Sequence, residues 1–266
     1  MKRALLSSVF LFLAACTPKA PTLPSGASAP FAEFASAYHE ATSRCDGVRT
    51  LSAALDLSGR AGRSKLRGTI HAGFEAPDAL RLEGIGPFGR TVFVLVARGT
   101  QSTLLLPRDD RVLHNAPPSA IVEALAGVAL APAQLRAVLA GCGFGTIQPV
   151  AGRAYERGWA AVDDGETTVY LQQVQGRWRL SAATRGPVTV HYRDFSSDRP
   201  SAVQLRTSPP SGTAADLTVK VSQVEINVPL APAAFEVDVP RDALPLTLDE
   251  LRRAGPLGEA RSAARR

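Results

Sequence analysis

The sequence has 266 residues, of which 45% are hydrophobic and 6% aromatic, and it contains 22 glycines and 20 prolines. Its length and apolar content suffice for one sizeable domain with a real core, and the many glycines and prolines favour short strands and turns over long helices. The net charge is +6, and without Lys2 and Arg3, which lie in a segment expected to be removed, Lys+Arg falls from 30 to 28 against 24 Asp+Glu. This mild, dispersed basicity suits an anionic membrane surface or a soluble protein. It argues against a nucleic-acid reader, which interleaves aromatic and basic residues.

Residues 1–15 have the pattern of a secretory signal peptide, with a basic start, the apolar run Ala4–Leu13 and small residues before Cys16. The apolar run is too short for a stable membrane-spanning helix. The ending Leu13-Ala14-Ala15-Cys16 resembles the lipobox of bacterial lipoproteins, in which the thiol is acylated and cleavage makes the cysteine the first residue. An ordinary secretory signal with a chance cysteine is the alternative. Because Thr17 follows, and not the aspartate that resembles an inner-membrane retention signal, the lipobox implies a lipid anchor at Cys16 on the periplasmic face of the outer membrane.

Three further segments frame the predicted domain. Residues 16–30 begin with this cysteine and continue in Pro, Ser, Ala and Gly without apolar periodicity, which predicts a flexible tether. Over residues 31–45 the apolar side chains have helical spacing, so we expect a short amphipathic helix leading into a domain that spans residues 31–255. Residues 256–266 form a basic tail rich in Ala, Arg and Gly that we expect to be disordered.

From Val48 onward the apolar period changes from helical to two. Apolar and polar residues alternate over Leu51–Ser58, Leu66–Phe74 and Leu80–Glu83. Each predicted strand therefore has one apolar and one solvated face, which is typical of an antiparallel sheet with one wet side. The next strand, Val92–Ala97, is apolar on both faces and needs an apolar cover on its second face.

The turn Gly86-Pro87-Phe88-Gly89 precedes this last strand. Proline, an apolar residue and glycine suit a tight turn in which Gly89 takes positive φ. A phenylalanine at a turn tip is costly in water. Phe88 is therefore either folded back onto the sheet or exposed for a purpose.

Two short helices are predicted after a brief hairpin, over Ser119–Ala126 and Ala133–Ala140. Each is preceded by a proline, which suits a first turn, and followed by a glycine, which suits a carboxyl cap. We expect these helices to cover the second face of Val92–Ala97.

After Cys142 the chain returns to strand patterns. A change of apolar phase at Ser222-Gln223 indicates a bulge or a break in one of them. Thr247-Leu248-Asp249-Glu250 is a capping box and predicts a short final helix through Arg253. The strand patterns cover residues 152–158, 159–164, 168–174, 177–182, 188–195, 202–206, 217–226 and 235–239.

With Cys16 assigned to lipid, Cys45 and Cys142 remain in an oxidising compartment. One flanks the entry to the first strand and the other follows the second short helix. A disulfide between them would close a loop of about 100 residues, worth roughly 4 kcal/mol in the loop-entropy model. Two buried thiols are the alternative.

Nothing in the sequence indicates catalysis. The four histidines show no paired metal-ligand spacing, and Gly-x-Ser-x-Gly, His-Glu-x-x-His and phosphate-loop motifs are absent. The acidic pairs Asp109-Asp110 and Asp163-Asp164 sit where polar turns are needed. We therefore predict no enzyme activity, no catalytic residue, no metal site and no cofactor.

The run from Leu80 to Leu139 resembles the outer-membrane lipoprotein receptor family LolB, which is related to the periplasmic carrier LolA. The matching features are a strand, the Pro-apolar-Gly turn, a second strand, a hairpin, and paired helices joined by Gly-Val-Ala-Leu-Ala-Pro. The resemblance implies a mainly β (α+β) fold, an open curved antiparallel sheet or incomplete barrel with short plug helices, and an apolar cavity for lipoprotein acyl chains. In that family the apolar residue of the turn protrudes and helps deliver cargo to the membrane, and its position here is Phe88.

These features predict an outer-membrane-anchored acceptor that takes a lipoprotein from a LolA-like carrier and releases it into outer-membrane phospholipid, as a monomer and without nucleic acid. The alternative is a structural or envelope-assembly lipoprotein that uses the same fold without lipid transport. The candidate residues could line an acyl cavity or form a dry core. They are Leu51, Leu55, Ile70, Leu80, Leu82, Phe93, Leu95, Ile121, Leu125, Leu135 and Leu139.

Overall fold

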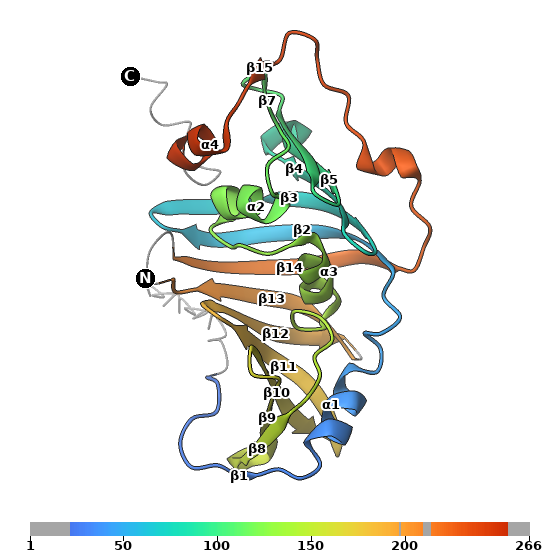
Figure 1. Ribbon diagram of the computed structural model, residues 1–266, viewed down its shortest axis with the longest axis vertical. Helices are drawn as coiled ribbons and strands as arrows, with labels where there is room; N and C mark the ends of the chain where they lie inside the picture. The colour runs from blue at the N-terminus through green and yellow to red at the C-terminus, as the bar shows by residue number, and fades with distance from the viewer. Residues whose placement is uncertain (1–21, 197, 210–213, 255–266) are drawn as a thin grey trace, which may run out of the picture.

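One sheet of 15 strands runs the length of the protein in the computed structural model, which describes residues 22–196, 198–209 and 214–254 (Figure 1). The predicted signal peptide, Cys16, the first part of the tether and the tail lie outside the described residues. The strands are β1 (Ala29–Pro30), β2 (Thr50–Ala61), β3 (Ser64–Glu75), β4 (Ala79–Ile85), β5 (Thr91–Arg98), β6 (Gln101–Leu106), β7 (Arg111–His114), β8 (Ala151–Tyr155), β9 (Trp159–Asp163), β10 (Thr167–Val174), β11 (Arg177–Arg185), β12 (Val188–Ser196), β13 (Arg199–Thr207), β14 (Ala215–Ile226) and β15 (Leu244–Pro245).

The sheet has two halves that meet in its middle. Its spatial order is β1-β8-β9-β10-β11-β12-β13-β14-β2-β3-β4-β5-β6-β7-β15. β14 returns to pair with β2, from Ala215 opposite Ala61 to Ile226 opposite Leu51. The outermost described strands, β1 and β15, lie at opposite ends of this order, so the sheet does not close. The expected mainly β fold with an open curved sheet is confirmed.

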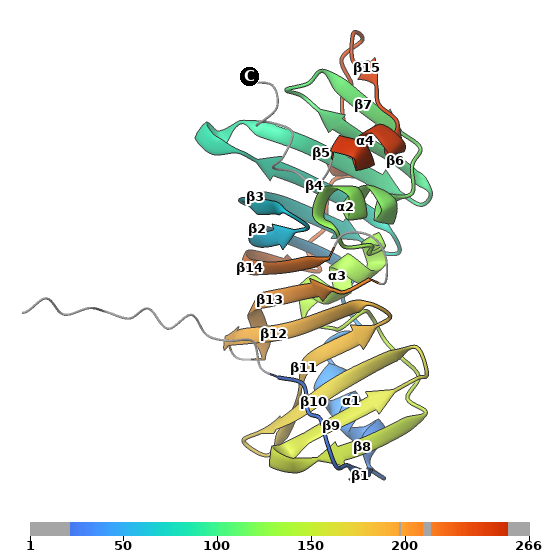
Figure 2. The same cartoon turned by 90° about the vertical axis from the view of Figure 1, so that its left-hand side faces the viewer.

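Short helices pack on one face of this sheet. They are α1 (Phe34–Thr42), α2 (Pro118–Ala126), α3 (Pro132–Ala140) and α4 (Leu248–Ala254). Figure 2 shows α2, α3 and α4 on the same side of the strands. As predicted, α2 and α3 begin at prolines and end at glycines in the left-handed region, with φ 73° at Gly127 and 81° at Gly141. The left-handed cap lets the Gly127 N–H donate to the carbonyl of Glu123 at 2.7 Å.

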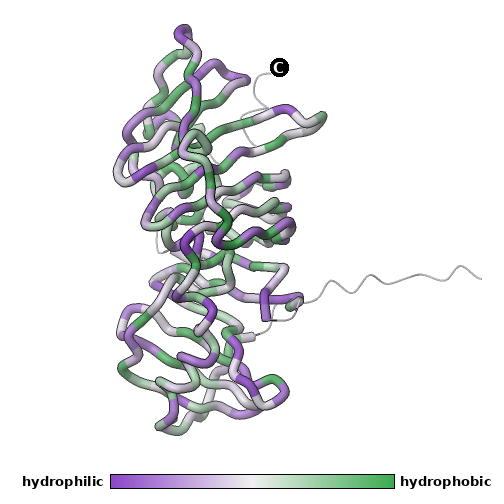
Figure 3. Tube along the Cα trace, turned by 90° about the vertical axis from the view of Figure 1, so that its right-hand side faces the viewer, coloured by the Kyte–Doolittle hydropathy of each residue, from purple (hydrophilic) through white to green (hydrophobic). Residues whose placement is uncertain are grey.

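Period-two patterning places apolar residues towards the helices along most strands, and hydrophobic and hydrophilic residues alternate along the chain trace (Figure 3). The predicted irregularity in β14 is confirmed, because the register with β2 shifts between Ser222 and Glu225 and Gln223 has a φ of 50°. The last two residues assigned to the tether, Ala29 and Pro30, pair with β8 at the edge of the sheet.

The cover of β5 differs from the prediction. Its residues Phe93, Leu95 and Ala97 face the helix-side core. Val94 and Val96 belong to a second apolar cluster, in which the cover comes from the segment after β14 and not from the helices. The members of this second cluster are Val94, Val96, Leu105 and Val112, with Val237, Val239 and Ala243 packed against them.

The strand predicted over residues 235–239 is also wrong. A short 3-10 turn (Pro232–Phe235) is followed by an irregular stretch. The guanidinium of Arg81 donates to the carbonyls of Ala234 and Glu236, at 3.4 and 3.0 Å, so a side chain takes the place of a strand neighbour. The alternating apolar residues Val237 and Val239 pack against the outer face of the sheet.

The chain then turns around the sheet edge. β15 pairs with β7 in parallel, and α4 packs against α2 on the helix side. The predicted capping box opens α4, because Thr247 Oγ1 accepts from the Glu250 N–H at 3.2 Å while a Glu250 carboxylate oxygen accepts from the Thr247 N–H at 2.8 Å. The segment from residue 230 to residue 254 is therefore a strap that covers both faces of one sheet end.

Candidate functional site

The eleven residues predicted to line an acyl cavity all lie on the helix side of the sheet, in one apolar cluster or packed against it. Ile70, Leu82 and Leu135 are partly buried. The other eight are at most 6% exposed. The structure thus brings the candidates together, in a core that the protein fills with its own side chains.

The strand register makes this face continuous. At one position the ring of Phe93 lies over Gly84, where an added Cβ would stand 2.1 Å from a ring carbon. Only glycine allows the ring to lie so close to the neighbouring strand. A row of residues that face one another from strand to strand crosses β3 to β7. The row is Ala72, Leu82, Leu95, Leu104 and Leu113.

α2 and α3 roof this face through apolar side chains. The link between them is buried as well, with Val128 and Leu130 each 2% exposed. Two side-chain hydrogen bonds fasten the roof to the sheet: Arg136 Nη1 in the middle of α3 donates to the Pro77 carbonyl, and Thr207 Oγ1 donates to the Gly127 carbonyl at the end of α2, both at 3.2 Å.

The sequence-based list omitted the second half of this core. The strands β9 to β14 contribute more buried apolar side chains than β2 to β5, and their period-two alternation was the available signal. The core therefore runs along the whole sheet. Examples from this half are Val162, Val169, Leu171, Leu180, Val190, Val203, Leu205 and Leu217.

The Phe88 side chain is 99% exposed. It stands in a 3-10 turn (Pro87–Gly89) in which Phe88 and Gly89 both have positive φ, 64° and 70°. The turn is closed by a hydrogen bond from the Gly86 N–H to the Arg90 carbonyl at 2.9 Å. Figure 3 shows the β4–β5 hairpin projecting from the sheet with a hydrophobic tip. Phe88 is therefore exposed and not folded back onto the sheet.

Basic residues share this end of the sheet. Since β2, β4 and β6 run in the same direction, the β2–β3, β4–β5 and β6–β7 turns all lie at one end. Asp109 and Asp110 are the acidic residues of the β6–β7 turn. Exposed basic side chains on these turns and the adjoining strand ends are Arg60, Arg63, Lys65, Arg67, Arg90 and Arg108.

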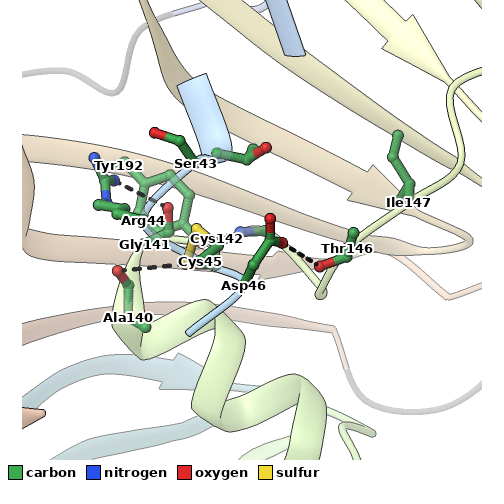
Figure 4. The surroundings of a disulfide bond; sticks show 12 residues. Ser43, Arg44, Cys45, Asp46, Ala140, Gly141, Cys142, Thr146, Ile147 and Tyr192 are labelled. Atoms are coloured by element: carbon green, nitrogen blue, oxygen red, sulfur yellow. Dashed lines mark hydrogen bonds between the residues drawn. A yellow bond between two sulfur atoms is a disulfide. The ribbon is translucent and has the colours of Figure 1, made fainter. Parts of the chain in front are cut away.

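Cys45 and Cys142 are joined in a disulfide with a Cα–Cα distance of 5.7 Å (Figure 4). It ties the segment after α1 to the segment after α3. Two hydrogen bonds beside the disulfide also hold the loop after α3. Arg44 Nη2 donates to the Gly141 carbonyl at 3.3 Å, and the hydroxyl of Tyr192 accepts from the Gly143 N–H at 2.9 Å.

Two buried titratable side chains have displaced pKa values. Burial raises the pKa of Tyr192 well above its usual range, so the phenol stays neutral and serves as an acceptor for the loop after α3. Burial, with Arg206 and Arg193 nearby, lowers the pKa of His191, which faces away from the helix-side core.

Metal and membrane-spanning features are not found in the part of the chain that the structure describes. No cluster of three His, Cys, Asp or Glu side chains there could hold a metal ion. None of the described helices is long and apolar enough to cross a membrane.

An open curved sheet with a helix-covered apolar face is the architecture that these observations define. No family model and no curated protein matches the sequence. Among solved structures, the chain is similar to a domain described as an outer-membrane lipoprotein-sorting protein from Vibrio parahaemolyticus, with 11% identity, coverage of 75% of this chain and 94% of that one, and a TM-score of 0.48. A LolA superfamily protein from Nitrosomonas europaea has 12% identity, coverage of 76% and 98%, and a TM-score of 0.48. The lipoprotein LppX of Mycobacterium tuberculosis has 12% identity, coverage of 74% of this chain and 96% of that one, and a TM-score of 0.32.

Proposed function

We propose that the protein is a LolB-like acceptor, anchored to the outer membrane through Cys16, that binds the acyl chains of a lipoprotein and inserts it into the membrane. The observation that carries this proposal is the continuous apolar face of the sheet beneath two helices of nine residues each. A LolA-like carrier delivers the cargo, outer-membrane phospholipid receives it, and the acceptor works as a monomer without a cofactor.

Acyl chains enter this core by displacing α2 and α3. Two side-chain hydrogen bonds fasten the roof, and its inner contacts are apolar. Apolar contacts have no directional requirement, so methylene groups can replace leucine and isoleucine side chains against the same strand row. Each methylene of the acyl chain that becomes buried contributes about 0.8 kcal/mol to the free energy of binding. Displacing the apolar side chains of the roof costs free energy that offsets a large part of this gain. Binding and release can then stay close to balance without a fuel.

Delivery takes place at the end that carries Phe88. An exposed aromatic side chain at a projecting tip inserts into the interfacial region of a bilayer, and the surrounding basic side chains attract anionic headgroups. The exposed arginines and lysine of the three turns supply that attraction. This end is the membrane-facing surface in the proposal.

Binding of a fluorescent acyl probe by the Cys16→Ser chain tests the proposed function. We expect saturable binding that a lipoprotein-derived acyl peptide displaces. Leu135→Glu, in the partly buried face of α3, should weaken it because a carboxylate then faces the acyl chains, whereas Ala133→Glu, exposed on the same helix, should not. Saturable binding that Leu135→Glu leaves intact would place the probe elsewhere.

A structural or envelope-assembly lipoprotein is the second candidate function. It is favoured by the filled core, in which eight of the eleven candidate side chains are at most 6% exposed. A core that stays closed would give no saturable probe binding. That result would leave this second function standing and remove the first.

A further inference from the structure

The sheet parts between β11 and β12. The two strands pair only from Arg185 opposite Val188 to Ala182 opposite His191. Beyond this point β11 remains paired with β10 as far as Arg177. β12 instead remains paired with β13, as far as Ser196 opposite Arg199. Figure 1 shows α1 beside this end of β11.

A pocket of about 210 Å³ lies where the strands have parted. Its walls come from the end of α1, from the β10–β11 turn with the start of β11, and from Asp198 between β12 and β13. None of the eleven candidate acyl residues lines it, although Ala41 of the helix-side core and Trp178, which packs against that core, form part of its wall. The indole of Trp178 forms part of the wall.

Positive charge is concentrated in this pocket. The guanidinium groups of Arg44, Arg177 and Arg179 line it against two carboxylates, Glu40 and Asp198. Glu40 is 3.8 Å from Arg177. The two other arginines are half-buried, and among the described residues their Nε atoms have no hydrogen-bond partner although they are shielded from solvent.

The surroundings hold these two guanidiniums in place without neutralising them. Arg179 stacks on the ring of Phe195, with its guanidinium carbon 3.8 Å from the ring centroid. Arg44 donates to the Gly141 carbonyl. Burial lowers the pKa of Arg44 and of Arg179, Asp198 partly opposes this effect at both, and the nearby Arg199 adds to it at Arg44. Because the Nε atoms are covered by protein atoms, an anion in the pocket would pair with the outer amino groups of the two guanidiniums, and a half-buried guanidinium is costly unless an anion pairs with it.

We propose that this pocket binds an oxyanion of the phosphate type, either free phosphate or the phosphate of a lipid headgroup. Several oxygens on one centre can accept from two guanidinium forks together, which is the geometry that arginine recognises best. The volume suits a phosphate with a small substituent, and the polar walls do not suit an acyl chain. The site stands whether or not the helix-side core carries lipid.

Trp178 gives a direct readout. The sequence has two tryptophans, so the full chain with Trp159→Phe reports from Trp178 alone. Titration with inorganic phosphate, with sodium chloride added to hold ionic strength constant, should change its fluorescence saturably. Arg179→Gln and Arg44→Gln should each raise the Kd about tenfold or more, because each removes charge-assisted hydrogen bonds. Circular dichroism and thermal melts establish that each variant is folded, and Arg179→Gln carries the test if Arg44→Gln unfolds.

Arg185→Gln is the matched control. It lies on the same strand but at the opposite end, exposed and paired with Glu166 at 3.1 Å, so its Kd should equal that of the parent. A second titration uses soluble dihexanoyl phosphatidylglycerol. Tighter binding of this lipid than of phosphate identifies a headgroup ligand, and equal or weaker binding identifies the free anion. No saturable response to either probe, or a response that Arg179→Gln leaves unchanged, overturns the proposal.

Discussion

At the scale of single residues, Phe88 combines two costs. Its ring is almost fully exposed, and its φ of 64° lies in the left-handed region that disfavours a bulky side chain. Phe88→Gly should therefore leave stability equal or raise it by about 1 kcal/mol, as measured by urea unfolding. A residue retained at a cost to stability points to a role outside folding.

For that role we predict that Phe88→Glu spares folding and cargo uptake but blocks lipoprotein transfer into liposomes. A carboxylate at the tip cannot enter the bilayer and is repelled by anionic lipid. Transfer is followed by flotation of labelled lipoprotein with the liposomes. Phe88→Leu is the control, since it keeps the apolar character. Normal transfer by Phe88→Glu would sink the delivery role.

Gly84 tests the packing of the strand row. Gly84→Ala forces the Phe93 ring to move, because the new Cβ would lie 2.1 Å from it. We expect a loss of about 1–3 kcal/mol in the free energy of unfolding, the usual cost of overpacking. Gly47→Ala, which meets nothing within 4 Å, should change it by less than about 0.5 kcal/mol. Equal effects of the two substitutions in urea unfolding would show that the ring does not rest there.

At the scale of elements, the disulfide joins the ends of α1 and α3 across 97 residues of sequence. Replacing both cysteines by serine should lower the free energy of unfolding by roughly 4–5 kcal/mol, the loop-entropy value for this length. Denaturant unfolding of the double variant measures the loss, and the parent protein unfolded in the presence of a reductant should match it. A double variant as stable as the oxidised parent would contradict the bridge.

Local signals predicted the elements well. Pro118, Gly127 and the Thr247 capping box act through neighbours a few residues away, and the β14 phase change is visible in the strand itself. The failures come from distant contacts. The pattern of Phe235, Val237 and Val239 resembles a strand, but these residues pack on the far side of β4 and β5.

Only half of the apolar core was predicted from the sequence, again because distant contacts join its two halves. Leu51, Leu80 and Leu95 stand in strong alternations, and the structure places them in the helix-side core. Val162 and Val203 belong to shorter or weaker patterns, and only the return of β14 to β2 joins their half to the first. The arginine pocket was missed because its residues come from three separate segments with no motif.

At the scale of the whole molecule, one apolar core extends along the helix side of both halves of the sheet. A long acyl chain of about 15 methylenes would gain on the order of 10 kcal/mol on burial. Displacing two short helices costs a comparable amount, since α2 and α3 bury several large apolar side chains each. In the proposed function, this balance would allow capture and release by one site, with the opening of the roof as the central step.

The most direct test maps where a bound acyl chain lies. A lipoprotein-derived peptide with a diazirine in its acyl chain is bound, irradiated, and the adducts are located by mass spectrometry. We expect adducts on the helix side, in β3 to β5 and in α2 and α3, at Leu82, Leu95 and Leu135 among others. Adducts confined to the outer face around Val94 and Val96, or no saturable adduct at all, would contradict it.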